Sequence, residues 1–161
     1  MVDSLSPEQR SLNMSRVRGK DTAPEIAVRR ILHADGLRFR LHRRDLPGRP
    51  DIVLPRHRAA VQVHGCFWHG HSCPLFRLPG TRTEFWRSKI DANRHRDCRA
   101  TEALRALEWR VVVVWECALR GSGRLNPADL SERLRAFVLG RASGCEVAGR
   151  FATSDRAGVA A

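Results

Sequence analysis

The chain has 161 residues, enough for one domain with a small sheet and covering helices around a single core. Lysine and arginine total 29 against 17 acidic residues, giving a formal net charge of +12, and arginine supplies nearly all of the positive charge. This balance predicts a polyanionic partner and favours nucleic acid. No apolar run approaches the roughly 18 residues of a membrane helix, and the first ten residues lack a signal-peptide pattern. We therefore expect a cytoplasmic protein without membrane contact.

The N-terminal segment is basic and begins with a helix-start signal. Ser6 followed by Pro7 is typical of an N-cap with proline at the first helical position. The residues after it predict a short basic arm or helix. The basic side chains of this segment are Arg10, Arg16, Arg18 and Lys20. We predict that residues 1–20 form an arm outside the main domain.

The next segment predicts a helix and then a strand. Thr22 and Glu25 have the spacing of a capping box, and apolar residues at helical spacing continue to Gly36. Residues 37–42 alternate between apolar and basic side chains, which is the period of a half-exposed strand with a basic outer face.

The middle of the chain predicts a hairpin, a long helix and a buried strand. Residues 51–54 and 59–64 are rich in branched side chains and flank a short turn, as in a β-hairpin. Residues 83–107 form a long charged helix, either continuous or broken into two. Residues 111–115 are apolar without alternation, which predicts a strand buried on both faces in the middle of the sheet.

The last part of the chain predicts one more helix and a tail. Asn126-Pro127 is a helix start, and the helix should run to about Leu139. Residues 141–161 are small and polar, so we expect a disordered C-terminal tail. The predicted organisation is one α/β domain over residues 21–140, between the arm and the tail.

Asp51 stands where a two-strand nuclease motif places its first metal ligand. It begins the first hairpin strand, and Val63 and His64 end the second. A carboxylate and a backbone carbonyl are the hard oxygen ligands that Mg²⁺ prefers, and bound metal would polarise a phosphate and help form hydroxide from water. The usual motif has an acidic residue and a lysine on the second strand, which this chain lacks. By spacing alone, Asp51 is equally explained as a turn residue after Arg49-Pro50.

Histidines and cysteines cluster directly after the second hairpin strand. Within residues 64–73 there are three histidines and two cysteines, a density that core packing does not explain. Four residues can form a closed tetrahedral zinc shell, which would be structural because it leaves no open position. They are Cys66, His71, Cys73 and Cys117. The alternative is a group of free thiols; Cys98 and Cys145 are predicted to bind no metal.

His69 then remains without a zinc role. Because an imidazole titrates near neutral pH, His69 is a candidate general base that takes a proton from an attacking water. Spacing alone also allows the opposite assignment, in which His69 binds zinc and His71 does not.

Aromatic side chains accompany these polar residues. Phe67 and Trp68 lie in the Cys/His segment, and Phe85 and Trp86 lie at the start of the long helix. Aromatic rings next to basic charge can stack on bases or insert between base pairs. We predict core positions for Phe85 and Trp109, an inserting role for Phe67 and Trp68, and either role for Trp86.

Several strings of residues are long and chemically unusual. They are RSLNM (10–14), LPGRPD (46–51), HGCFWH (64–69), TRTEFW (81–86) and VWECALRG (114–121). On these strings the chain resembles the very-short-patch repair (Vsr) endonucleases over roughly residues 8–140.

The resemblance implies a restriction-endonuclease-like fold, a mixed central β-sheet flanked by helices with a structural zinc site. It implies a Mg²⁺-dependent nick on the 5′ side of the thymine in T:G mismatches, which arise when 5-methylcytosine deaminates. The nick would leave 5′-phosphate and 3′-hydroxyl ends. The implied partners are mismatched duplex DNA, mismatch-repair proteins and a repair DNA polymerase, with the enzyme acting as a monomer near the nucleoid.

The resemblance also assigns roles to residues by position. Asp51 would bind Mg²⁺ with help from the Val63 carbonyl, His69 would be the general base, and His64 would orient or stabilise the phosphate. Glu25 would be a further active-site carboxylate besides its capping role. The implied zinc ligands are Cys66, His71, Cys73 and Cys117. The implied DNA-binding residues are the inserting Phe67, Trp68 and Trp86 and the arm residues Arg16, Arg18 and Lys20.

The chain departs from the family pattern at two positions. The family commonly has threonine at position 63 and histidine at position 70, where this chain has Val63 and Gly70. The first change is harmless if position 63 contributes only its carbonyl, and the second makes His71 the more secure zinc ligand. Two alternatives to a mismatch nickase remain, a restriction-type endonuclease that cuts matched duplex and a zinc-stabilised DNA-binding module without catalysis.

Overall fold

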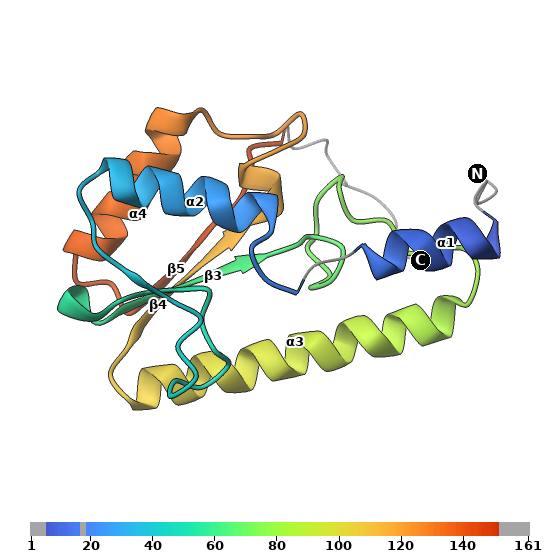
Figure 1. Cartoon of the computed structure of the whole chain (residues 1–161), viewed down its shortest axis with the longest axis horizontal. Helices are drawn as coiled ribbons and strands as arrows, with labels where there is room; N and C mark the ends of the chain where they lie inside the picture. Colours follow the sequence, from blue (N-terminus) through green and yellow to red (C-terminus); the bar gives the residue numbers. More distant parts are fainter. Residues whose placement is uncertain (1–5, 17–18, 152–161) are drawn as a thin grey trace, which may run out of the picture.

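The computed structural model describes residues 6–16 and 19–151 and has a mixed α/β architecture, as predicted (Figure 1). The helices are α1 (Pro7–Ser15), α2 (Ala23–Ala34), α3 (Thr83–Ala106) and α4 (Pro127–Leu139). The strands are β1 (Arg40–Leu41), β2 (Ile52–Leu54), β3 (Ala59–His64), β4 (Arg110–Trp115) and β5 (Gly144–Val147). Single 3-10 turns follow β2 (Pro55–His57) and β4 (Glu116–Ala118).

The five strands form one mixed sheet in the order β1-β2-β3-β4-β5. The β2–β3 pair is antiparallel, as the hairpin signal predicted, and the β1–β2 pair is antiparallel as well. The β3–β4 and β4–β5 pairs are parallel, with α3 and α4 as their connections. β4 therefore has a neighbour on each edge, which agrees with its continuous apolar sequence.

Helices cover both faces of this sheet (Figure 1). One core cluster joins α2 and α4 to the sheet, with Val28, Leu32 and Leu134 fully buried against Val61 and Val112. A second cluster places α3 on the opposite face. It contains Leu46, Val53, Ala60, Leu104, Trp109 and Val111. Alternate side chains of β3 and β4 thus pack into the core clusters on opposite faces of the sheet, so neither strand needs a polar face.

Local sequence signals explain where three of the four helices begin. Ser6 caps α1 in a reciprocal capping box with Gln9. Thr22 accepts the Glu25 amide at the start of α2, and Asn126 accepts the amide of a first-turn residue of α4. α3 begins after Arg82, which has a left-handed φ of 53° and makes no side-chain cap, and it continues without a break.

The strand predicted over residues 37–42 is much shorter in the structure. Only Arg40 and Leu41 pair with β2, and Leu41 is 42% exposed. β2 has three residues, so it offers few partners, and His42 leaves the extended conformation with a φ of 45°. Alternation in the sequence therefore predicted the exposure pattern of residues 37–40 but not that of Leu41, and it overestimated the length of the strand.

The expectation of a disordered tail after residue 140 is wrong for its first part. Gly144–Val147 form β5, which pairs with β4 from Val111 to Val114. The Glu146 carboxylate accepts a hydrogen bond from the Trp115 indole at 3.0 Å. This order depends on pairing with a distant strand, which the small, weakly apolar residues of β5 do not reveal. Residues 152–161 of the predicted tail lie outside the described residues.

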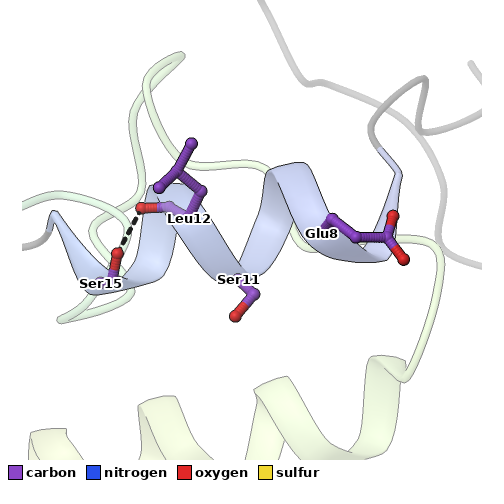
Figure 2. A pocket seen from close by; sticks show the side chains of 4 residues that line it. All are labelled: Glu8, Ser11, Leu12 and Ser15. Carbon is purple, nitrogen blue, oxygen red and sulfur yellow. Dashed lines mark hydrogen bonds between the residues drawn. The ribbon is translucent and has the colours of Figure 1, made fainter.

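α1 projects from the sheet domain beside the N-terminal half of α3 (Figure 1). An open hollow on its surface is lined by Glu8, Ser11, Leu12 and Ser15, and the Ser15 hydroxyl donates to the Leu12 carbonyl (Figure 2). This hollow holds no histidine, cysteine or aspartate. Among the described residues, no helix is long and apolar enough to cross a membrane.

Truncating a core leucine tests the packing of α2 against the sheet. We expect Leu32→Ala, at a fully buried position, to lower the free energy of unfolding by about 2–5 kcal/mol. The matched control is Leu139→Ala, because Leu139 is 54% exposed at the end of α4. Urea denaturation monitored by circular dichroism measures both, and equal losses would contradict the described core.

Candidate functional site

The predicted catalytic residues meet where β3 ends. Asp51 directly precedes β2, and its carboxylate accepts a hydrogen bond from the Val63 amide at 2.7 Å. The antiparallel β2–β3 pairing produces this contact, because it brings the start of one strand beside the end of the other. The Val63 amide is thus occupied, and the valine side chain offers no oxygen. Its carbonyl is the only group of Val63 that could bind a cation.

Asp51 carries a charge that its surroundings compensate poorly. Burial raises the pKa of Asp51 to about 6, against the opposing effect of the Val63 amide, and the nearby Glu25 carboxylate raises it further. The Asp51 side chain is 22% exposed. A buried carboxylate with a raised pKa fits a site for a hard cation, because a bound cation would replace the lost solvation of the charge.

His64, the residue after Val63, stacks face to face with His69. Their ring centroids are 4.0 Å apart with an interplanar angle of 2°. The Nδ1 atom of His69 lies 2.5 Å from the Asp97 carboxylate of α3. Because Nδ1 is engaged by Asp97, Nε2 is the His69 nitrogen that can accept a proton from a substrate or a water.

His64 and Asp97 differ in how their surroundings shift their pKa values. Burial lowers the pKa of His64 to about 4, and the neighbouring His69 lowers it further. His64 is therefore neutral near pH 7 and can donate only one N–H. Burial acts to raise the pKa of Asp97, but the hydrogen bond with His69 and the nearby ring charges outweigh it and lower that pKa. Asp97 is consequently an anion, which accepts a hydrogen bond from Nδ1 of His69.

Sequence reasoning missed Asp97 and its neighbour Asn93. Both lie on α3, one helical turn apart, and face the loop that follows β3. The Asn93 amide donates to the Trp68 carbonyl at 2.8 Å, so α3 holds this loop at two points. The i, i+4 spacing of Asn93 and Asp97 on a helix could have indicated that they share a face. However, α3 is charged along its whole length, so its sequence offers no reason to select these two residues from the others.

The four predicted zinc ligands come together in one cluster. Every pair of ligand atoms from Cys66, His71, Cys73 and Cys117 lies within 4.8 Å. The His71 Nδ1 atom is 3.7 Å from the Cys66 sulfur and 3.5 Å from the Cys117 sulfur. Tetrahedral zinc, with Zn–S near 2.3 Å and Zn–N near 2.0–2.1 Å, would set this sulfur–nitrogen distance at about 3.6 Å. The cluster therefore fits a tetrahedral zinc ion.

The ambiguity between His69 and His71 is resolved by this geometry. His71 belongs to the sulfur cluster, whereas His69 belongs to a separate group with His64 and Asp97. Among the described residues, Cys98 and Cys145 belong to neither cluster. Burial raises the pKa of the Cys66 and Cys117 thiols, so without metal both stay protonated at neutral pH. Zinc binding would release these protons.

Close packing fixes the loop that carries the ligands. Gly70 has a φ of +63°, and a Cβ there would lie 2.8 Å from the Ile90 side chain, so glycine suits this turn. His71 stacks on Trp115 with centroids 4.2 Å apart, and the edge of Trp115 also contacts His64. Trp115 therefore joins the zinc cluster to the histidine pair.

Glu25 is buried and fully engaged at the start of α2. Its carboxylate accepts hydrogen bonds from the Asp21 amide at 3.0 Å, the Thr22 hydroxyl at 3.0 Å and the Arg29 guanidinium at 2.9 Å. It is 4% exposed and near enough to Asp51 to raise the pKa of that residue. Glu25 thus has its structural role at the helix start and also contributes to the electrostatics of Asp51.

The loop aromatics form a cluster with the start of α3. Phe67 contacts Trp68 and Trp86 at centroid distances of 5.2 and 5.4 Å, and all three side chains are partly exposed. The Lys89 ammonium lies over the rings of Trp68 and Trp86. This aromatic cluster (Phe67, Trp68 and Trp86) is a partly exposed apolar surface with positive charge beside it.

One of the two aromatic core predictions is wrong. Trp109 is buried at 8% exposure, as predicted, but Phe85 is 46% exposed. Phe85 lies in the first turn of α3, away from the sheet, where it packs on Trp86 and beneath the Arg82 guanidinium. Helical spacing did not identify the exposed face of this first turn, because α3 extends beyond the edge of the sheet that it covers (Figure 1).

The predicted DNA-binding arm is described only in part. Arg16 at the end of α1 and Lys20 after it are both exposed. Arg18 lies outside the described residues.

Comparison with known proteins identifies similar chains. A family model described as DNA mismatch endonuclease Vsr matches residues 2–75. A type II nicking enzyme, V.XorIIP from Xanthomonas oryzae pv. oryzae, is 57% identical over 126 residues, which cover 78% of this chain and 93% of the relative. The DNA mismatch endonuclease Vsr of Escherichia coli is 44% identical over 147 residues, covering 91% of this chain and 94% of the relative. The type II nicking enzyme V.NmeAIP from Neisseria meningitidis is 39% identical over 138 residues, covering 86% and 95%.

Removing one zinc ligand tests the metal cluster. We expect Cys73→Ser to lose stoichiometric zinc and about 3 kcal/mol or more of stability, a Tm decrease of about 6–12 °C, because the loop loses its link to β4. Elemental analysis and thermal unfolding measure the two effects. The control is Cys98→Ser on α3, which should keep both zinc and Tm; equal zinc content in the two variants would contradict the site.

Neutralising Asp51 tests the cost of burying its charge. Because the folded pKa, about 6, lies above the ordinary value of 3.8, the fold loses stability as pH rises from about 4 through 6. In buffer without Mg²⁺, we expect Asp51→Asn to be more stable than the parent at pH 7.5 by about 1–3 kcal/mol. Urea denaturation should show this advantage shrinking at pH 4.5. An equally stable or less stable variant at pH 7.5 would show that the charge is well compensated.

Proposed function

Since this chain belongs to the Vsr family of DNA mismatch endonucleases and is a DNA nicking endonuclease, we propose that its target is the T:G mismatch and that it cuts 5′ of the mispaired thymine. Such mismatches arise when 5-methylcytosine deaminates. The nick would leave a 5′-phosphate and a 3′-hydroxyl from which a repair polymerase can synthesise a short patch. Two relatives are named as nicking enzymes rather than mismatch endonucleases, so the choice of target is the part that needs testing.

The observation that carries the mechanism is the convergence of two groups at the end of β3. Asp51 is held by the Val63 amide, and the next residue, His64, stacks on His69 with its Asp97 partner. A binding module would have no use for a poorly compensated carboxylate and an imidazole–carboxylate pair that are both attached to the end of one strand. A hydrolase needs both, one to hold a cation and one to move a proton.

Asp51 and the Val63 carbonyl would hold Mg²⁺. When bound, this ion would polarise the scissile phosphate and lower the pKa of a coordinated water. Side chains of the protein transfer the proton and contact the phosphate. His69 takes the proton of the attacking water at Nε2, and Asp97 orients the imidazole through Nδ1 and stabilises the imidazolium that forms. Neutral His64 donates an N–H to a phosphate oxygen. Glu25 raises the pKa of Asp51 through its charge and does not contact the substrate.

The zinc cluster would keep this arrangement rigid. Cys66, His71 and Cys73 lie in the loop that also carries His69, and Cys117 follows β4. A zinc ion therefore ties the loop to the sheet on one side, while α3 holds it on the other through Asn93 and Asp97. With both ends fixed, His69 needs no rearrangement before it acts.

The surface beside the site suits distorted duplex DNA. The aromatic cluster is partly exposed and has the Lys89 ammonium over two of its rings. We assign Phe67, Trp68 and Trp86 to insertion beside the mismatch, where the weakened stacking of a mispair makes opening less costly. Arg16, Arg18 and Lys20 of the arm would contact phosphates, which adds affinity without reading sequence.

Cleavage of labelled duplexes tests the function. With Mg²⁺, we expect a single nick 5′ of the thymine in a T:G duplex, little cleavage of the matched duplex, and losses of about 10²-fold or more in Asp51→Ala, His69→Ala and Asp97→Asn. The control for the last variant is Asp91→Asn, an exposed aspartate on the same helix.

Three results would contradict parts of this proposal. Equal cutting of matched and mismatched duplexes would identify a restriction-type activity. Binding without cutting, at any site, would leave only a zinc-stabilised binding module. Full activity of Asp97→Asn would remove the carboxylate from the proton-transfer pair.

A further inference from the structure

His42 lies between the proposed metal ligand and a buried ionic cluster. It immediately follows β1, and its backbone amide donates to the Asp51 carbonyl at 3.3 Å. Its Nδ1 atom is 3.9 Å from the Asp51 carboxylate. On the opposite side of the ring, Nε2 is 3.1 Å from the Arg29 guanidinium, 3.6 Å from Glu25 and 3.7 Å from Asp21. One side chain thus spans the distance between Asp51 and the start of α2.

The contact with Arg29 selects the tautomer of this imidazole. A guanidinium has donors only and does not lose its proton in proteins. At 3.1 Å from Arg29, the His42 Nε2 atom must therefore accept, so the proton of a neutral ring lies on Nδ1. Arg29 is itself fixed by hydrogen bonds to Asp21 at 2.7 Å and Glu25 at 2.9 Å. The single N–H of His42 is consequently presented on the side of Asp51.

A second metal site at this cluster is a poorer explanation. Asp21, Glu25 and His42 have ligand atoms within 4.8 Å of one another. However, Arg29 donates to both carboxylates and to the imidazole, so a cation already occupies the position that a metal ion would take. The cluster is balanced by that arginine, and the far side of His42, with Nδ1, faces Asp51.

We propose that His42 is a positioning residue for nicking. Its Nδ1–H orients the Asp51 carboxylate, its backbone amide holds the Asp51 main-chain carbonyl, and Arg29 fixes its tautomer. The inference rests on the proposed role of Asp51 as metal ligand. The 3.9 Å separation is long for a direct hydrogen bond, but hydrogen bonds of catalytic groups are often long before the substrate is bound and shorten afterwards. The Val63 amide binds one oxygen of Asp51 and His42 faces the other, so the carboxylate is oriented from two sides.

Two substitutions distinguish the effect of the His42 Nδ1–H donor from that of the His42 backbone. His42 has a φ of 45°, a left-handed conformation that glycine and asparagine both tolerate. His42→Gly keeps the backbone and removes the donor, whereas His42→Asn retains an N–H donor close to the position of Nδ1. The control is His33→Asn, because His33 is exposed at the end of α2.

Nicking and metal binding are measured side by side. In His42→Gly we expect the single-turnover rate on T:G duplex to fall about 10- to 100-fold with unchanged DNA affinity, since a misplaced ligand affects the reaction and not the complex. His42→Asn should recover to within about threefold of the parent. Binding of Mn²⁺, followed by electron paramagnetic resonance without DNA, should weaken in the glycine variant and recover in the asparagine variant.

The proposal is overturned if His42→Gly retains the parent rate and Mn²⁺ affinity. It is equally overturned if both variants lose the same activity, because the N–H donor would then not matter. The metal-binding comparison needs no cleavage, and Asp51→Ala is measured alongside it. If the parent cuts no mismatched duplex, the proposed function fails. The Mn²⁺ measurements still decide whether His42 affects the cation site.

Discussion

Pairing of β3 along both of its edges is the constraint on which the candidate sites depend. On one edge, the antiparallel partner β2 brings Asp51 to the Val63 amide. On the other, the parallel partner β4 sets His64 opposite Trp115 and leads on to Cys117. Residues from three distant parts of the chain therefore meet at one end of one strand. A slip of a single residue in either register would turn the side chains to the opposite face and separate these groups.

Burial at this end of the sheet disfavours the charged forms of its ionisable side chains, an arrangement that suits a nuclease. It raises the pKa of Asp51 and lowers that of His64, so both groups are pushed towards their neutral forms. Asp97 differs, because its hydrogen bond to His69 keeps it ionised. The protein thus maintains an anion beside His69, the proposed general base, and a poorly compensated carboxylate at Asp51, the proposed Mg²⁺ ligand. The fold gives up some stability for this arrangement, as active sites commonly do.

Polar contacts and the proposed zinc site hold the shape of the loop after β3. The zinc cluster connects it to β4, and Asn93 and Asp97 connect it to α3. Trp115 lies between the zinc ligand His71 and the catalytic candidate His64. Loss of the metal would consequently disturb His69 as well as stability, although His69 does not belong to the zinc cluster. The partly exposed aromatic cluster belongs to the same loop and to α3, so the proposed DNA-contacting residues and the proposed catalytic residues share one support.

The sequence by itself determined the mixed α/β class, the starts of α1, α2 and α4, the hairpin and the composition of the cysteine cluster. Each of these depends on local chemistry: capping side chains, turn residues, apolar runs, or ligands close together in the chain. Only the tertiary structure decided between His69 and His71, revealed Asp97, Asn93 and His42, and ordered β5. Those outcomes depend on which distant segments become neighbours. A charged helix such as α3 presents many equivalent carboxylates until packing selects one of them, and a weakly apolar strand such as β5 forms only because β4 offers it an unpaired edge.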